Sequence, residues 1–148
     1  TSGVIAIQFA KYLGAEVTGV CSTKNLDFVN LLGADKVLAY TNHESTAELE
    51  LYDVILDSVG KAKTSPLKEA CRKSLCKNGK YISIDDSPLI LNSERLLKIK
   101  ELVENKDIIP INEKCYNFDQ IVDAHKYVEL GHKKGNIAIT VNTLVTLR

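Results

Sequence analysis

Short β-branched runs alternate with helix-like stretches along almost the whole chain, and this alternation limits the fold more than any other feature. The runs 16–21 and 52–57 carry β-branched residues and predict buried strands. The apolar residues of 5–13 and 25–32 recur at helical spacing and predict helices. Strands that alternate with helices of about 8–15 residues are typical of βαβ units, in which helices cover both faces of a parallel sheet. We therefore predict an α/β fold with a doubly wound parallel sheet.

Turn and cap residues mark the boundaries of the other elements. The expected helix ends are Gly14 and Gly33, and the expected helix starts are Ser65 with Pro66, Ser93, and Asn117 with Gln120. Further strands are expected at 36–40, 80–84 and 137–141, an extended edge segment at 108–111, and a short helix near 45–50. The tail 142–148 has strand-compatible residues but no assigned element.

The composition is that of an ordinary globular domain and argues against two classes of partner. At 148 residues the chain is long enough for one domain with its own core. Lysine plus arginine and aspartate plus glutamate each number 19, so the formal net charge is zero. A neutral chain offers no electrostatic attraction to nucleic acid or to an anionic membrane. Because no apolar stretch approaches the ~20 residues of a membrane span, we expect neither partner.

The four cysteines do not form a metal-binding or redox pattern. They are Cys21, Cys71, Cys76 and Cys115, and no two of them make a C-x-x-C pair. The chain has three histidines, which are scattered along the sequence. We therefore expect no metal site, and reduced thiols that serve mostly in packing, as in a cytoplasmic protein.

The segment 22–24 follows the predicted strand 16–21 and leads into the predicted helix 25–32. In dinucleotide-binding βαβ folds this strand end contacts the adenosine ribose, and NAD-binding chains usually place a carboxylate there for the 2′-hydroxyl. This chain has Ser22, Thr23 and Lys24 instead. A carboxylate would repel a 2′-phosphate, whereas an ammonium group beside two hydroxyls attracts it. We therefore predict a Rossmann-type domain that binds NADP(H) through these three residues.

Five segments resemble the cofactor domain of the medium-chain dehydrogenases/reductases, in the branch of the quinone oxidoreductases and zinc-type alcohol dehydrogenases. The segments are 6–15 (AIQFAKYLGA), 32–37 (LGADKV), 52–60 (YDVILDSVG), 77–81 (KNGKY) and 131–136 (GHKKGN). Their order and spacing match the family, and the resemblance extends over residues 1–141. It implies the cofactor-binding domain of an oxidoreductase that transfers hydride between NADP(H) and an alcohol, carbonyl or quinone.

The resemblance and the expected strand ends together imply the other cofactor-binding residues. Ser2 and Gly3 correspond to the end of the family's glycine-rich turn, where the backbone approaches the pyrophosphate. Tyr40 ends a predicted strand and is expected to close over the 2′-phosphate. The remaining expected residues end the strands 52–57 and 80–84, on the ligand-binding side of the sheet: Asp57, Ser58, Val59, Gly60, Ile84 and Asp85. For Asp57, capping of the loop is favoured over catalysis as a base.

The sequence also departs from the family. In the family a strand precedes the helix 5–13, and a catalytic domain precedes that strand. Neither is in this sequence, so we expect 1–148 to be a cofactor-binding fragment without dehydrogenase activity of its own. Residues 110–148 are expected to pack on the catalytic domain, which would supply the site for the small-molecule substrate. We expect a homo-oligomer, and a vacant strand position that is filled by association or by the segment 137–147.

Two other functions fit the alternation of strands and helices. One is an S-adenosylmethionine-dependent methyltransferase, whose fold also carries a Lys-Asn-Gly turn before a strand. Such an enzyme would place an acidic residue after the strand 16–21, where this chain has Ser22. The other is a non-catalytic module that binds NADP(H) or only packs against a partner.

Overall fold

The computed structural model describes residues 2–60, 64–86, 92–131 and 133–141, and in this part of the chain all strand pairs are parallel. The pairs are β1 (Thr18–Cys21) with β2 (Lys36–Ala39), β3 (Tyr52–Asp57) with β4 (Leu75–Ser83), and β5 (Asn112–Asn117) with β6 (Asn136–Thr140). The parallel α/β arrangement predicted from the sequence is therefore confirmed. The strands form three separate pairs, however, and not one continuous sheet.

The helices begin and end close to the predicted residues. They are α1 (Ser2–Tyr12), α2 (Leu26–Leu31), α3 (Pro66–Lys73), α4 (Ser93–Glu104) and α5 (Ile121–Glu129), with single 3₁₀ turns at Thr23–Asn25, His43–Thr46 and Phe118–Gln120. Gly14 and Gly33 adopt left-handed φ angles of 78° and 98° after α1 and α2, as expected for helix ends. The Ser65 hydroxyl accepts a hydrogen bond from the Lys68 amide, which confirms it as the cap of α3.

Several predicted boundaries are wrong. The strand expected at 80–84 is β4, which begins five residues earlier, at Leu75. The cap of α4 is Asn92 and not Ser93, because the Asn92 side chain accepts from the Arg95 amide and Ser93 already lies in the helix. The short helix expected near 45–50 is a 3₁₀ turn that begins earlier, at the Asn42 cap. The segment 108–111 is not a strand, since the strand begins one residue later, at Asn112.

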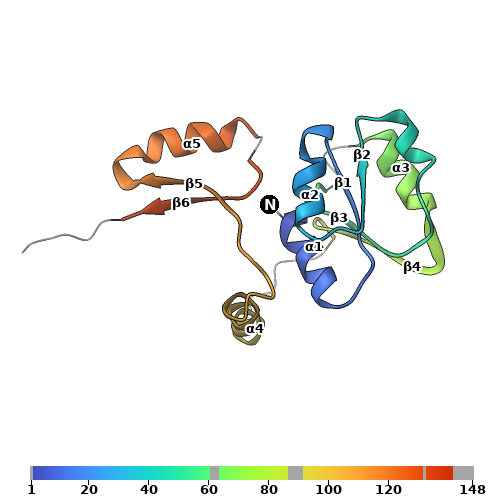
Figure 1. Cartoon of the computed structure of the whole chain (residues 1–148), viewed down its shortest axis with the longest axis horizontal. Coiled ribbons are helices and arrows are strands. Elements are labelled where there is room, and N and C mark those ends of the chain that lie inside the picture. Colours follow the sequence, from blue (N-terminus) through green and yellow to red (C-terminus); the bar gives the residue numbers. More distant parts are fainter. Residues whose placement is uncertain (1, 61–63, 87–91, 132, 142–148) are drawn as a thin grey trace, which may run out of the picture.

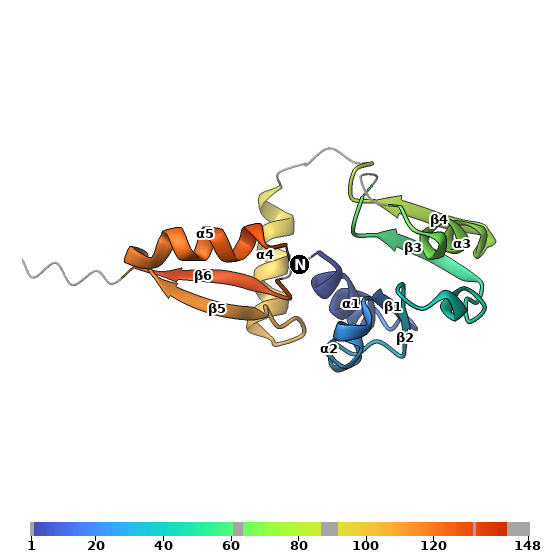
Figure 2. The ribbon, with the colours of Figure 1, turned by 90° about the horizontal axis from the view of Figure 1, so that it is seen from above.

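The elements form two groups (Figures 1 and 2). One contains β1 to β4 with α1, α2 and α3, and the other contains β5, α5 and β6. Buried apolar residues in the first group include Val29 of α2, Ala34, and Leu38 of β2. A side chain at Gly19 of β1 would collide with Val29, so this glycine lets α2 pack directly on the strand.

The two strand pairs of the first group are not joined by hydrogen bonds. Within the described residues β1 pairs with β2 alone and β3 pairs with β4 alone, so one edge of β1 and one edge of β3 lack a partner. Residues 137–140, expected as one possible filler of this position, lie in β6 and pair with β5. That expectation is wrong for these residues. Val141 follows β6 and lies in no strand, and residues 142–147 of the proposed filler lie outside the described part of the chain.

Candidate dinucleotide-binding site

The loop after β1 brings together the residues predicted to bind the 2′-phosphate. Ser22 follows the strand directly, and Lys24 lies exposed in the 3₁₀ turn Thr23–Asn25. The Asn25 side-chain amide donates to the Ser22 hydroxyl at 3.2 Å. Thr23 and Thr41 share a hydrogen bond between their hydroxyls of 2.5 Å, which ties this loop to the end of β2.

Tyr40 lies beside Thr41, at the end of β2, with 51% of its side chain exposed. The Tyr40 amide donates to the Cys21 carbonyl at 2.9 Å, so the ends of β1 and β2 remain in register up to the loops. The fold thus places Tyr40 at the same edge as Ser22, Thr23 and Lys24. This edge offers hydroxyls, a phenol and an ammonium group, which are donors suited to a phosphate.

Asp57 ends β3 and is buried, with both carboxylate oxygens engaged. Its Oδ1 accepts from the amides of Val59 and Gly60, each at 3.1 Å. Its Oδ2 accepts from the Tyr81 hydroxyl at 3.0 Å and pairs with Lys68 Nζ at 2.8 Å. Burial opposes ionisation, but these hydrogen bonds outweigh it and hold the pKa of Asp57 below its ordinary value. The carboxylate therefore fixes the turn that follows β3, as the loop-capping interpretation expects.

The start of α1 lies against that same turn. A side chain at Gly3 would stand 3.1 Å from Ser58 Oγ, so the first turn of α1 and the loop after β3 meet where Gly3 has no side chain. Ser2 is the first residue of the helix and is exposed. The unpaired amides of a helix N-terminus favour an anion, and the small residues here leave room for one to approach the backbone.

The turn after β3 also contacts the turn after β4. Gly60 has a φ of 81°, and a side chain there would stand 2.5 Å from Asp85 Oδ2. The Ile84 amide donates to the Asp57 carbonyl at 3.1 Å, which aligns the two strand ends. Val59 and Ile84 are 58% and 47% exposed, so both offer apolar surface to a planar ring. All of the predicted residues of β3 and β4 thus meet at the carboxyl ends of the strands.

Sequence reasoning missed two residues that contact Asp57 and stabilise the turn after β3, Lys68 and Tyr81. Lys68 comes from α3, where its ammonium group also donates to the Gly60 carbonyl at 2.6 Å. Tyr81 comes from β4, and the Arg72 guanidinium lies 4.5 Å from the centre of its ring. A lysine three residues after a helix cap gives no sequence signal of its own, because surface lysines are common there. Thr41 could have been found, since it follows a predicted strand on the ligand side.

The thiols and the acidic residues do not form a second site in the part of the chain that the structure describes. The cysteines are free, and burial raises the pKa of the Cys21 and Cys71 thiols, which makes both poor nucleophiles. No group of three or more metal-ligating side chains occurs among the described residues. None of the described helices has the length and apolar character needed to cross a membrane.

The arrangement suits an anionic dinucleotide. A loop with hydroxyls and an ammonium group lies at the carboxyl end of β1, and the N-terminus of α1 meets an apolar turn at the carboxyl end of β3. From the sequence, these are the parts expected to hold the pyrophosphate, the ribose phosphate and a planar ring. Both carboxylate oxygens of Asp57 are engaged by the turn, Tyr81 and Lys68, so a structural role for Asp57 is favoured over proton transfer.

Comparisons with known proteins agree with this geometry. Residues 3–101 match the family model of the zinc-binding dehydrogenases. The bovine (Bos taurus) protein named NAD(P)H oxidoreductase RTN4IP1, mitochondrial, is 31% identical over 94% of this chain and 45% of its own length. The chain thus spans about half the length of the curated relatives it matches.

Two solved structures share the fold. The quinone oxidoreductase from Coxiella burnetii has a TM-score of 0.67 and 21% identity, and the similarity covers 91% of this chain and 48% of that one. A mycobacterial protein complexed with NADPH has a TM-score of 0.68 and 16% identity, with 93% of this chain and 52% of that one covered. The chain belongs to the zinc-binding dehydrogenase family, within the medium-chain dehydrogenase/reductase superfamily.

Proposed function

We propose that this chain is the cofactor-binding part of an NADP(H)-dependent oxidoreductase that transfers hydride to or from an alcohol, carbonyl or quinone. The observation that carries the proposal is the loop Ser22–Asn25, where the Thr23–Thr41 hydrogen bond brings Lys24 to the same edge as Tyr40. An ammonium group and hydroxyls at the end of β1 favour a 2′-phosphate over a ribose hydroxyl. Nicotinamide cofactors appear in the names of the bovine relative and the mycobacterial structure.

In this proposal the protein binds and orients the cofactor, which supplies the hydride when bound. The N-terminus of α1, with Ser2 and Gly3, holds the pyrophosphate. Ser22, Thr23, Lys24 and Tyr40 hold the adenosine 2′-phosphate. Ser58, Val59, Gly60, Ile84 and Asp85 line the nicotinamide end. Asp57 stiffens the turn between these groups through its contacts with Lys68 and Tyr81.

The substrate site and the reaction itself belong to the complete protein. We infer that residues 110–148, which include β5, α5 and β6, pack on a catalytic domain that binds the small-molecule substrate, and that the protein is a homo-oligomer. A cytoplasmic location remains a prediction, and the name of the bovine relative places that protein in mitochondria. Membership of a dehydrogenase family argues against the methyltransferase alternative.

Titration of the complete gene product with NADPH and NADH tests the proposal. We expect tighter binding of NADPH. Lys24→Met should cost about 1–3 kcal/mol of NADPH affinity, the scale of a charge-assisted hydrogen bond, and leave NADH almost unchanged. Lys77→Met is the matched control, because it removes the same charge from an exposed lysine. Lys77 lies near the N-terminal end of β4, whereas the candidate site lies at the carboxyl ends of the strands. An equal loss for both cofactors would show that Lys24 does not contact the 2′-phosphate.

Assays of the 148-residue chain alone and of the complete gene product separate an enzyme from a binding module. We expect NADPH oxidation with quinones or aldehydes from the complete protein only. Turnover near ~1 s⁻¹ by the chain alone, which is the low end of typical enzyme rates, would overturn the assignment of the reaction to another domain. No turnover by the complete protein, with NADPH binding intact, would favour the non-catalytic module.

A further inference from the structure

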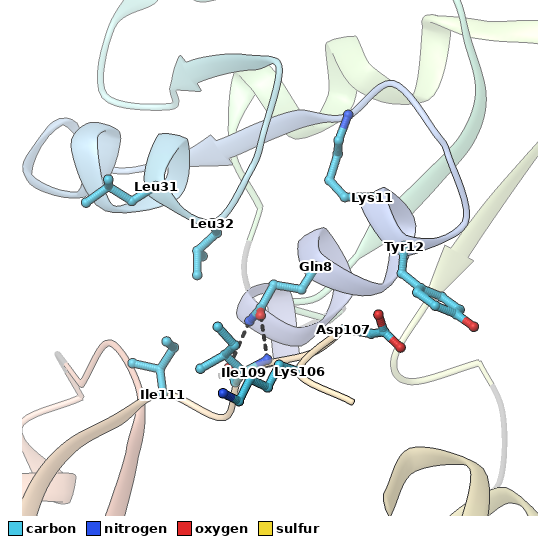
Figure 3. A pocket seen from close by; sticks show the side chains of 9 residues that line it. All are labelled: Gln8, Lys11, Tyr12, Leu31, Leu32, Lys106, Asp107, Ile109 and Ile111. Carbon is cyan, nitrogen blue, oxygen red and sulfur yellow. Dashed lines mark hydrogen bonds between the residues drawn. The ribbon is translucent and has the colours of Figure 1, made fainter. Parts of the chain in front are cut away.

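The side-chain amide of Gln8, on α1, pairs with the backbone of Ile109, which lies 101 residues later in the chain (Figure 3). Gln8 Nε2 donates to the Ile109 carbonyl at 3.1 Å, and Gln8 Oε1 accepts from the Ile109 amide at 2.8 Å. Nε2 also donates to the Val4 carbonyl at 3.3 Å, which fixes the orientation of the amide. A primary amide presents a donor and an acceptor side by side, so Gln8 pairs with a peptide unit as a neighbouring strand would.

The same segment is held on its other side by β6. The Ile111 carbonyl accepts from the Asn136 amide at 2.6 Å, and a side chain at Gly135 would collide with that carbonyl. Pro110 lies between the two anchored residues, and its ring fixes φ. Gln8 and Asn136 are therefore joined through three consecutive residues, of which the middle one is stiff.

Few other contacts join the two groups of elements within the described residues. The helix and strands of the second group, β5, α5 and β6, pack chiefly on one another. Lys134 Nζ lies 5.9 Å from the centre of the Phe28 ring, on α2. Leu31, Leu32 and Ile111 line an open cleft of about 270 Å³ beside Gln8 (Figure 3). Gln8 and Ile109 thus supply hydrogen bonds between the first group of elements and the segment that leads to the second group, where few other contacts are made.

We propose that Gln8 is a positioning residue, which docks the segment 106–111 on α1 and so sets the orientation of β5, α5 and β6 relative to the cofactor-binding helix. α1 carries Ser2 and Gly3 at its start and Gln8 about one and a half turns later. One rigid helix therefore contacts both the expected pyrophosphate position and the segment that leads to the second group. The effect on turnover rests on the proposed function, whereas the docking itself does not.

Amide hydrogen exchange on the complete gene product tests the docking. Gln8→Met keeps the approximate length of the side chain and removes both hydrogen bonds. We expect exchange at the amides of Ile108, Ile109 and Ile111 to rise about tenfold, the scale of one or two lost hydrogen bonds, while β6 and α5 stay unchanged. Gln120→Met is the matched control, because Gln120 also accepts from a backbone amide, that of Asn117 at 3.0 Å, but within the second group.

Gln8→Glu provides a second variant, with a pH profile. The carboxylate still accepts from the Ile109 amide but places a negative charge against the Ile109 carbonyl, so exchange at neutral pH should be faster than in the wild type. Protonation of the carboxylate at low pH restores a donor. The exchange rate of the Gln8→Glu variant, divided by that of the wild type, should then fall toward one. Unchanged exchange in 108–111 in both variants would overturn the proposal. A rise spread equally over α1 and β1 would overturn it too, because Gln8 would then stabilise its own helix.

Steady-state kinetics and NADPH titration of the same variants test the positioning role. We expect Gln8→Met to lower kcat several-fold with the Kd for NADPH unchanged, because the contact lies away from the start of α1. Loss of docking with unchanged kcat would overturn the positioning role. If the wild-type protein itself shows no NADPH binding or turnover, the proposed function fails, but the exchange data still decide the docking.

Discussion

Asp57 and Lys68 form a buried ion pair beneath the candidate site, and single residues matter most there. Their side chains are 6% and 14% exposed, and both also hydrogen-bond to the turn at residues 59 and 60. Loss of one partner leaves the other charge without its counterion in a place that water hardly reaches. The conformation of the turn after β3 therefore depends on Lys68, which lies outside the turn, as well as on Asp57.

Lys68→Met should lower the free energy of unfolding by about 3 kcal/mol, because it leaves a buried carboxylate without its counterion. Denaturant unfolding measures the loss. Lys126→Met is the control, since Lys126 pairs with Asp123 at 3.8 Å with both side chains about 70% exposed, and it should change stability by less than about 1 kcal/mol. Similar losses in the two variants would show that the Asp57–Lys68 pair is effectively solvated.

The lowered pKa of Asp57 predicts the direction of a pH effect. A carboxyl group whose pKa is lower in the folded state contributes stability above its unfolded pKa of about 3.9, and this contribution is lost as the pH falls through the folded value. Asp57→Asn should therefore flatten the fall in stability between about pH 5 and pH 2. Thermal denaturation across that range measures it, and an unchanged profile would show that other carboxyl groups cause the acid sensitivity.

At the scale of elements, one backbone position determines how closely α2 packs on β1, and another determines how α4 ends. Gly19 of β1 gives α2 its close approach, and Lys106, which follows the Asn105 cap of α4, takes a left-handed φ of 65°. The amides of Asp107 and Ile108 both donate to the Leu102 carbonyl, which closes this helix end. Such positions usually carry glycine, so the lysine is a local departure from the favoured pattern.

Gly19→Ala should destabilise the protein by about 1–3 kcal/mol, because the new methyl group overlaps the Val29 side chain. The double variant with Val29→Ala should recover part of this loss, since the contacted methyl group is then absent. Denaturant unfolding of the two single variants and the double variant measures the coupling. Purely additive losses would show that the new methyl group does not interact with the Val29 side chain.

Lys106→Gly should stabilise the end of α4 by about 0.5–1 kcal/mol, because glycine adopts a left-handed φ without the clash of a side chain. The matched variant is Asn105→Gly, one residue earlier, where the φ of −75° is helical and glycine should destabilise. Unfolding measurements on both variants test the contrast. Destabilisation by both would indicate that the Lys106 side chain has a stabilising contact that outweighs its backbone strain.

For the whole molecule, the unpaired edges of β1 and β3 dominate the expected behaviour. Parallel strands are normally covered on both faces, yet Val20, Val54 and Leu56 are 46%, 57% and 47% exposed. An exposed strand edge with apolar side chains is a template for pairing with another chain. The 148-residue chain alone should therefore associate in a concentration-dependent manner.

Sedimentation of the 148-residue chain tests this prediction. Val54→Lys places a charge beside the open edge of β3 and should reduce association. Leu130→Lys is the control, because Leu130 is 66% exposed but follows α5, in the other group of elements. A monomer at all concentrations, or an equal effect of the two lysines, would exclude pairing at the open strand edges.

The sequence by itself indicated most of the local elements and the residue types at the candidate site, but not β5 or the first five residues of β4. Hydrophobic periodicity and cap residues are local properties, so α1, β3 and the cap at Ser65 could be predicted from neighbouring residues alone. The sequence also shows directly that Lys24, and not a carboxylate, lies in the loop after β1. The predicted start of α4 was wrong because two adjacent residues, Asn92 and Ser93, are both suited to cap a helix, and Asn92 is the one that does so.

Only the tertiary structure decided which distant residues meet. Lys68 of α3 reaches Asp57, Thr41 reaches Thr23, and Gln8 reaches Ile109, and none of these pairs follows from local spacing. Each contact depends on how helices lie across strand ends, which is set by packing over long sequence separations. The sequence indicated a doubly wound sheet with one strand position vacant, and among the described residues no hydrogen bond joins the β1–β2 pair to the β3–β4 pair.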